Sequence, residues 1–203
     1  MLGILTLGVD MLLILKNGRI IDSKIKNAIS PIIEHDDMVK VSGIIVHQTG
    51  GSTANSSLSS YKNKGANGAH FLIDKDGTIY QTASIYKQTW HVGKLKSRCV
   101  LEKRCSKAET ERNKTYNPSK ENEREQKKSP PDRFPSNKDS IGIELVGETD
   151  KDDNYVAVTH EQNKSLKWLI EQLELTLFIP FTEVFRHPTV SRKNPTEANT
   201  AQW

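Results

Sequence analysis

The residues from 185 to 198 bring together side chains that could bind a metal ion and take part in catalysis. The run reads Phe-Arg-His-Pro-Thr-Val-Ser-Arg-Lys-Asn-Pro-Thr-Glu-Ala and contains a histidine, cations and a carboxylate. His187 follows the apolar pair Val184 and Phe185, so we expect its imidazole at the end of a short strand, facing a cleft. A second β-branched run, Val41–Val46, ends in His47 before a turn-prone Gln-Thr-Gly-Gly-Ser. Two histidines at strand ends form a candidate metal site.

Strand and helix patterns alternate along the chain and predict an α/β fold with a mixed central β-sheet flanked by helices. Asp76-Gly77 indicates a hairpin turn, and Thr159-x-x-Gln162 is a helix capping box. The segment 23–34 fits a weak helix or a loop. The expected strands are Met11–Ile21 with a turn at Asn17-Gly18, Val41–Val46, Ala69–Asp74, Thr78–Gln81 and Asp139–Val146. The expected helices are Ala54–Asn63, Ser119–Lys128 and the run from Thr159, whose Leu166, Leu169, Ile170 and Leu173 recur at helical spacing.

The chain length of 203 residues suits one domain. We expect a lead-in and first strand over residues 1–22, and one domain over 23–203 that carries a charged insertion at about 95–138. The insertion holds thirteen Lys and Arg against seven Asp and Glu, so it is basic while the remainder is nearly neutral. It could contact an anionic polymer, although a solvated insertion explains the charge equally well. Only Tyr116 and Phe134 could stack on bases there, which argues against nucleic-acid binding.

Targeting signals and cysteines leave the compartment open. Residues 1–15 are apolar but interrupted by Asp10, and they lack a basic start and a small-residue cleavage site, so no secretory signal peptide is predicted. No apolar run long enough for a membrane span is found. Cys99 and Cys105 have five residues between them, unlike a CxxC zinc or redox pair. They could form a small disulfide outside a cytosol, but their spacing does not decide this.

Five blocks occur in a fixed order along the chain: Ile44-Ile-Val-His47, His70-Phe-Leu-Ile-Asp74, Trp90-His-Val-Gly93, Ser140-Ile-Gly-Ile-Glu144 and His187. This order resembles the zinc-dependent N-acetylmuramoyl-L-alanine amidases, a superfamily that includes phage lysozyme-amidases and animal peptidoglycan-recognition proteins. The resemblance covers roughly residues 41–93 and 139–198. It implies a mixed sheet with zinc bound at strand ends by His47, His187 and an acidic or cysteine ligand. Such a zinc keeps an open position for water and lowers the pKa of that water towards about 7.

The resemblance also implies catalytic residues. Ala69 stands where many members have a tyrosine, so the tyrosine-assisted mechanism is not expected. Glu144 matches the glutamate that cytosolic muropeptide amidases use as general base, and a structural ion pair is its alternative role. Lys193 resembles the lysine that stabilises the oxyanion of the tetrahedral intermediate, with Arg192 as the competing cation.

The remaining site residues are assigned by position. His91 matches a family position that lines the substrate groove, so we expect it, together with Tyr80, to contact the muropeptide. His70 fits a buried core histidine better than a ligand. Glu197 lies ten residues after His187, the ligand spacing of the cytosolic branch, so it is the expected third zinc ligand.

Glu197 has a structural alternative. Asn194-Pro-Thr-Glu197 also reads as a helix start with Asn as N-cap and Glu at the capping-box position. In that case Thr196 or a water would be the third ligand. The shorter ligand spacing of the cysteine branch does not apply here, because it lands on Pro195, which has no donor atom for a metal.

The expected reaction is hydrolysis of the amide bond between the lactyl group of N-acetylmuramic acid and L-alanine in peptidoglycan, with zinc as cofactor. A peptidoglycan-binding protein that has lost catalysis is the alternative. The substrate lies in the bacterial cell wall, so three routes fit: a phage endolysin, a toxin delivered by type VI secretion, or a cytosolic recycling enzyme. The insertion and its cysteines favour the first two routes. A delivered toxin would be accompanied by an immunity protein as a partner.

Overall fold

The centre of the protein is a six-stranded mixed sheet. The computed structural model describes residues 11–203, so the expected lead-in over Met1–Asp10 lies outside the described residues. The strands follow the order β3-β6-β5-β7-β4-β8, with β5 and β6 antiparallel and the other neighbours parallel. This arrangement confirms the predicted α/β class. The strands are β3 Ile25–Asn27, β4 Gly43–Gly50, β5 Phe71–Ile73, β6 Ile79–Gln81, β7 Ser140–Glu148 and β8 Val184–Arg186.

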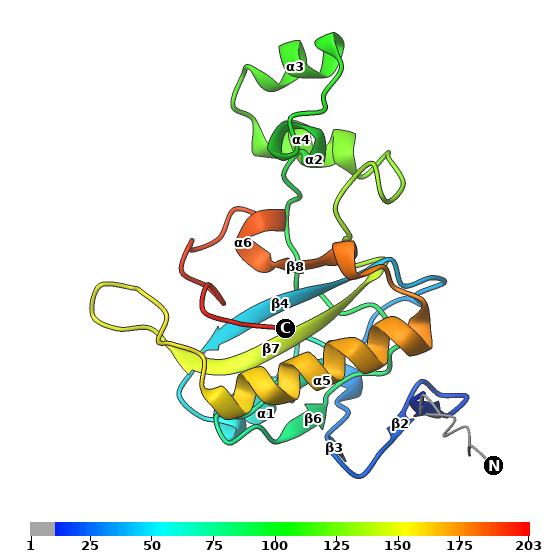
Figure 1. Ribbon diagram of the computed structural model, residues 1–203, viewed down its shortest axis with the longest axis vertical. Coiled ribbons are helices and arrows are strands. Elements are labelled where there is room, and N and C mark those ends of the chain that lie inside the picture. The colour runs from blue at the N-terminus through cyan, green and yellow to red at the C-terminus, as the bar shows by residue number, and fades with distance from the viewer. Residues whose placement is uncertain (1–10) are drawn as a thin grey trace, which may run out of the picture.

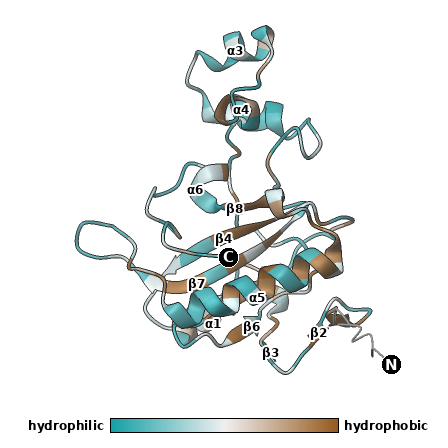
Figure 2. Cartoon of the chain, viewed as in Figure 1, coloured by the Kyte–Doolittle hydropathy of each residue, from teal (hydrophilic) through white to brown (hydrophobic). Residues whose placement is uncertain are grey.

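One face of the sheet is covered by the long helix α5, His160–Leu177 (Figure 1). Its capping box forms as predicted, because Thr159 accepts from the Gln162 backbone while the Gln162 side chain accepts from the Thr159 backbone. The predicted apolar residues of α5 are buried against the inward side chains of β4, β5 and β7. Figure 2 shows the hydrophobic strands beneath the helix. This face therefore forms the main hydrophobic core.

The opposite face carries the polar residues of the central strands. In the β4–β7 register His47 lies beside Glu144, and Ile45 lies beside Gly142. Because side chains alternate along a strand, these residues point away from α5. β8 pairs with β4 in parallel and ends at Arg186, so His187 emerges at the same edge as His47. β4 continues past His47 to Gly50, further than the β-branched run suggested.

The N-terminal part differs from the predictions in two places. The expected strand Met11–Ile21 is a hairpin of β1 Leu13–Ile14 and β2 Ile20–Ile21, folded at the predicted Asn17-Gly18 turn. The ambiguous segment 23–34 contains β3, which pairs with β6, and a 3₁₀ turn η1 at Pro31–Ile33. The three residues of β3 are too few to show the alternation by which a strand is recognised. The expected helix at Ala54 is α1, Ala54–Ser60, with Thr53 as its N-cap.

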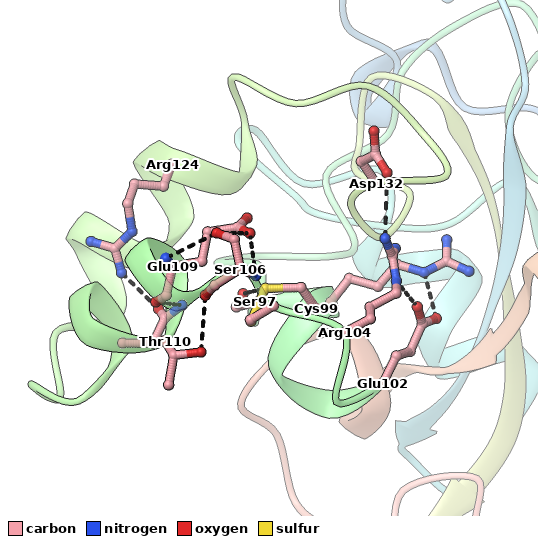
Figure 3. The surroundings of a disulfide bond; sticks show 12 residues. Ser97, Cys99, Glu102, Arg104, Ser106, Glu109, Thr110, Arg124 and Asp132 are labelled. Carbon is pink, nitrogen blue, oxygen red and sulfur yellow. Dashed lines mark hydrogen bonds and ion pairs between the residues drawn. A yellow bond between two sulfur atoms is a disulfide. The ribbon is translucent and has the colours of Figure 1, made fainter.

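The insertion forms a small helical lobe that projects from the sheet (Figure 1). It contains α2 Arg98–Leu101, α3 Lys107–Asn113 and α4 Pro118–Glu125, the last of which matches the expected helix near 119–128. Cys99 and Cys105 form a disulfide beside the Ser106–Glu109 capping box that begins α3 (Figure 3). None of the helices in the described part of the chain has the length and apolarity of a membrane span.

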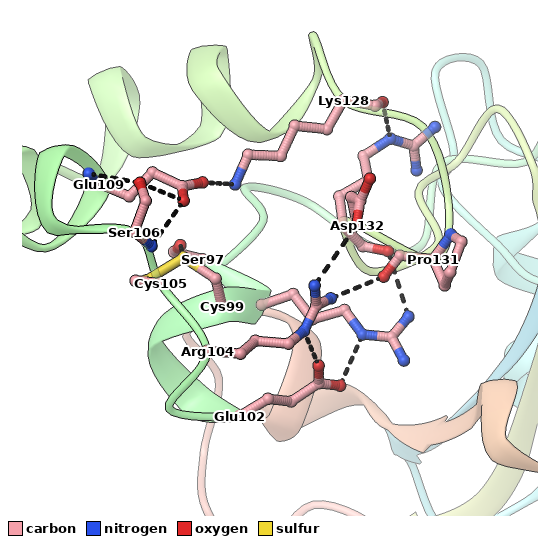
Figure 4. Close-up of polar contacts among 12 residues, drawn as sticks. Ser97, Cys99, Glu102, Arg104, Cys105, Ser106, Glu109, Lys128, Pro131 and Asp132 are labelled. Carbon is pink, nitrogen blue, oxygen red and sulfur yellow. Dashed lines mark hydrogen bonds and ion pairs between the residues drawn. A yellow bond between two sulfur atoms is a disulfide. The ribbon is translucent and has the colours of Figure 1, made fainter.

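Ion pairs and side-chain hydrogen bonds connect the segments of the lobe, which has few apolar residues. Lys128 reaches Glu109 at 2.9 Å, and Arg104 donates to the Pro131 carbonyl at 2.9 Å (Figure 4). The lobe is joined to the sheet by Arg98, whose guanidinium makes two 2.8 Å bonds to the carboxylate of Glu183. Both partners are buried, so losing either one would leave an uncompensated charge in the interior.

We predict that protein folded without reductant contains the Cys99–Cys105 bond, because the lobe has few apolar residues and depends on cross-links for its order. Its mass should be lower by two hydrogen atoms than that of the reduced protein. A Cys99→Ser variant, treated in the same way, provides the control whose mass does not change on reduction. Two thiols that alkylate freely in the unreduced protein would contradict this prediction.

Candidate active site and metal centre

Three side chains converge where β4 and β8 approach their shared edge. The Nδ1 atoms of His47 and His187 lie 2.8 Å apart. The Oε1 atom of Glu197 lies 2.9 Å from Nδ1 of His187 and 3.4 Å from Nδ1 of His47. All three side chains are buried, and together they form a group that could hold a metal ion. The hydrogen bonds around them show which of these atoms carry protons.

The tautomer of His187 follows from its second ring nitrogen. Nε2 of His187 lies 2.8 Å from the backbone carbonyl oxygen of Val92. A carbonyl only accepts hydrogen bonds, so Nε2 must carry the proton. Nδ1 is therefore the ring atom left to face His47 and Glu197, where it could bind a metal ion.

The tautomer of His47 follows from a longer chain of bonds. The Ser140 hydroxyl donates to the Ser136 carbonyl at 2.6 Å, so its oxygen is left to accept from Nε2 of His91 at 3.3 Å. Nδ1 of His91 then carries a lone pair and accepts from Nε2 of His47 at 2.9 Å. Nδ1 of His47 consequently also presents a lone pair to the centre of the group.

The electrostatics of His47 and Glu197 favour the forms of these side chains that bind a metal ion. Burial, reinforced by the neighbouring His187, lowers the pKa of His47 to about 4, so this ring is neutral at pH 7. Although burial raises it, the contacts with His187 and His47 bring the pKa of Glu197 down to about 2, so its carboxylate is ionised. Two imidazole nitrogens and a carboxylate oxygen at these separations suit zinc, whose bonds to such atoms are about 2.0–2.2 Å long.

The contacts around Glu197 distinguish its predicted role as a metal ligand from its alternative role in a helix capping box. Asn194 Oδ1 accepts from the Thr196 backbone at 2.9 Å, and residues 195–200 continue as turns. The carboxylate of Glu197 bonds to the histidines and does not return to the Asn194 backbone as a capping box requires. The Thr196 hydroxyl accepts from the Tyr155 backbone at 3.0 Å, away from the histidines. The geometry therefore favours the ligand role of Glu197 over the cap and over Thr196.

Glu144 lines a cavity of about 420 Å³ next to the three converging residues. Burial, with the nearby charge of Glu197, raises the pKa of Glu144 to about 8, while Lys193 acts in the opposite direction. Within the described part of the chain, no donor bonds to the buried Oε2 atom of Glu144. The alternative role of Glu144 in a structural ion pair thus finds no partner there, and its carboxylate is available to a ligand in the cavity.

Of the two competing cations, only Lys193 lines the cavity. Arg192 turns to the insertion, where it pairs with Glu121 and lies over the Tyr116 ring. The two neighbours therefore separate, with Lys193 near the site and Arg192 on the helical lobe.

The structure also places the two other histidines considered in the sequence, His91 and His70. His91 lines the cavity, but its Nδ1 atom already bonds to His47. His70 is fully buried and bonds to the Lys87 carbonyl, as expected of a core histidine.

Tyr80 does not line the cavity. It shares the sheet face of Glu144 but lies two strands away, roughly 10 Å, and packs with Leu72 and Leu58. Its predicted contact with the substrate is therefore not supported by its position.

Several cavity residues were not among the predicted site residues. Trp90 and Tyr155 line the cavity together with Asn67 and Asn194. The side chain of Trp90 is about half exposed and stacks on His35, with ring centroids 3.8 Å apart. Their only sequence signal was that Trp90 adjoins His91, since Tyr155 and the asparagines lie in irregular loops.

The chain was compared with known protein families and solved structures. The family model described as N-acetylmuramoyl-L-alanine amidase matches residues 37–198. The AmpD selenomethionine derivative is similar in structure, with TM-score 0.55, 20% identity and 91% of each chain covered. The catalytic domain of XlyA gives TM-score 0.51 and 20% identity over 83% of this chain and 87% of that one. A mutant endolysin from Bacillus subtilis gives TM-score 0.50 and 19% identity over 80% and 82%.

At these identities the structural matches establish the fold alone, and they confirm the predicted mixed sheet flanked by helices. Comparison with curated protein sequences found no significant match. The family model, however, spans most of the chain. The protein therefore belongs to the N-acetylmuramoyl-L-alanine amidase family.

Proposed function

We propose that this member of the family hydrolyses the amide bond between N-acetylmuramic acid and L-alanine in peptidoglycan, with a zinc ion held by His47, His187 and Glu197. The observation that carries the proposal is the convergence of two imidazole Nδ1 atoms and one carboxylate oxygen in a buried site. When bound, zinc would supply a Lewis acid that makes water nucleophilic at neutral pH and polarises the amide carbonyl.

Glu144 is the proposed general base. Its Oε2 atom takes a proton from the water whose oxygen attacks the amide carbon, and it returns the proton to the L-alanine nitrogen as the carbon–nitrogen bond breaks. The products are the lactyl carboxylate and a free amino terminus. A cation beside Glu144 would lower its raised pKa and keep it ionised before the proton transfer.

Lys193 is the proposed oxyanion stabiliser. Its ammonium group lies at the same cavity as Glu144, where negative charge develops on the carbonyl oxygen during attack. A protein that only binds peptidoglycan has no need for a carboxyl group with a buried, unbonded oxygen atom beside a lysine in the same cavity. The pair therefore favours catalysis over the non-catalytic alternative.

The proposed place of action is the bacterial cell wall, reached as an endolysin or as a delivered effector. The disulfide of the helical lobe supports this, since such bonds persist mainly in oxidising compartments. A delivered effector would have an immunity protein as its partner.

The zinc proposal predicts about one bound metal ion per chain in the purified protein. Chelation, or the substitution His47→Ala, should abolish the release of L-alanine amino termini from murein sacculi. The exposed helix residue His160, changed to Ala, is the matched control that keeps activity. If digestion released reducing sugar ends instead of amino termini, the protein would be a glycosidase.

Glu197→Gln tests the third ligand, because an amide keeps the size of the side chain but removes its charge. Changes to residues that only support metal ligands typically lower affinity about 10–100-fold, and we expect a larger loss of zinc affinity here. Glu123→Gln, on the surface of the lobe, should leave affinity unchanged. Full zinc occupancy and activity in Glu197→Gln would leave this carboxylate without a ligand role.

Glu144→Gln tests the general base. The variant should fold and bind zinc normally, since Glu144 is outside the ligand group, while its rate falls by about 10²–10⁴. Metal content and rate are measured on the same preparation. Turnover near the wild-type rate would assign the proton transfer to another group.

A further inference from the structure

Both histidines that face the proposed zinc position have their second nitrogen held by the same short segment. Nε2 of His47 bonds to Nδ1 of His91, and Nε2 of His187 bonds to the carbonyl of Val92, at 2.9 and 2.8 Å. Two adjacent residues in a loop therefore accept the proton of each ring. Their position decides that both Nδ1 atoms are left as ligands.

The segment is in turn fixed by one side chain, Asn137. Its Oδ1 atom accepts from the backbone nitrogen of His91 at 3.0 Å and from that of Val92 at 2.8 Å. Asn137 lies in the turn that leads into β7, and Asp139 braces this turn by accepting from the Ser136 backbone at 2.8 Å. One carboxamide oxygen thus ties the loop to the central strand that also carries Glu144.

The ring of His91 is held as closely as its backbone. It lies directly over Gly142 of β7, where an added Cβ would come within 2.8 Å of its Nδ1 atom. Its Nε2 atom faces the Ser140 hydroxyl at 3.3 Å. The absence of a side chain at position 142 is therefore required for the ring to reach His47 with its lone pair forward.

We propose that His91 and Asn137 are positioning residues of the zinc site, which fix both ligand histidines in the tautomer with the proton on Nε2. A neutral imidazole has two tautomers, and only one presents Nδ1 to the metal, so fixing it in advance raises affinity. Asn137 acts on both ligands because it holds both acceptors. This inference rests on the proposed zinc function and changes the expected role of His91 from substrate contact to support of a ligand.

The test compares the zinc affinity of variants by competition with a chelator, using the full chain. His91→Ala removes one acceptor, and Asn137→Ala releases the segment that carries both. His91→Gln and Asn137→Asp keep an oxygen that can accept and should recover most of the affinity. Lys138→Gln, at the exposed neighbour of Asn137, is the matched control. Thermal unfolding of each zinc-free variant shows whether it is folded.

We expect His91→Ala and Asn137→Ala to bind zinc about 10–100-fold more weakly than wild type. Nitrogen-15 spectra of the zinc-free wild type should show His47 and His187 protonated on Nε2, and His47 should become a tautomer mixture in His91→Ala. If His91→Ala keeps wild-type zinc affinity and tautomers, and only KM for a muropeptide rises, the proposal is overturned and His91 is a substrate contact. If the wild type itself binds no zinc, the proposed function has failed instead.

The milder variant Ser140→Ala keeps the test decisive if His91→Ala does not fold. It removes only the hydroxyl that accepts from His91, so it should loosen the tautomer of His47 and weaken zinc binding in the same direction. Unchanged tautomers in this variant, together with equal zinc affinity of Asn137→Ala and Asn137→Asp, would also count against the proposal.

Discussion

The contact between Nδ1 of His47 and Nδ1 of His187, 2.8 Å apart, is the constraint on which the site depends. The two Nδ1 atoms and the carboxylate of Glu197 are buried together and form a group that could hold a metal ion. Parallel pairing of β4 with β8 brings the two rings together, and the Nε2 atom of each ring is bonded to His91 or to Val92. The sheet thus brings together the three side chains that we propose hold zinc.

The pKa values of the two carboxyl groups beside this contact are shifted in opposite directions. Glu197 meets the imidazoles and keeps a pKa of about 2, whereas burial and the charge of Glu197 raise the pKa of Glu144 to about 8. Such separation is the usual sign that two acidic groups have different tasks. One suits permanent ligation, and the other suits proton transfer. The charge of Glu197 raises the pKa of Glu144, and the charge of Lys193 lowers it, so the three groups are electrostatically coupled.

The loop that carries Lys193 and Glu197 is held from two sides. On one side Arg192 pairs with Glu121 of the helical lobe. On the other side Asn194 donates to the Asp153 carbonyl at 2.5 Å, within the loop between β7 and α5. The acidic residues of the basic insertion are largely paired with its own cations. Through Glu121 the insertion also supports the loop that carries Lys193 and Glu197. Its cross-links by disulfide and ion pair keep that support in place.

The sequence by itself determined that His187 follows the end of a short strand, that a long capped helix begins at Thr159 and that the insertion is basic, because periodicity, caps and composition are local. It placed His47 on the correct strand but wrongly at its end, because the polar residues Gln48–Gly50 that continue β4 by pairing with β7 look like a turn in the sequence. The family resemblance suggested Glu197 as a ligand, whereas the local sequence also fitted a helix cap. Only the tertiary structure favours the ligand role, because β8 and β4 bring His187 and His47 together and the Glu197 carboxylate lies against both. Strand order likewise put Tyr80 two strands from the site. It also revealed Asn137, whose role exists only because the turn before β7 meets a loop some forty-five residues earlier in the chain.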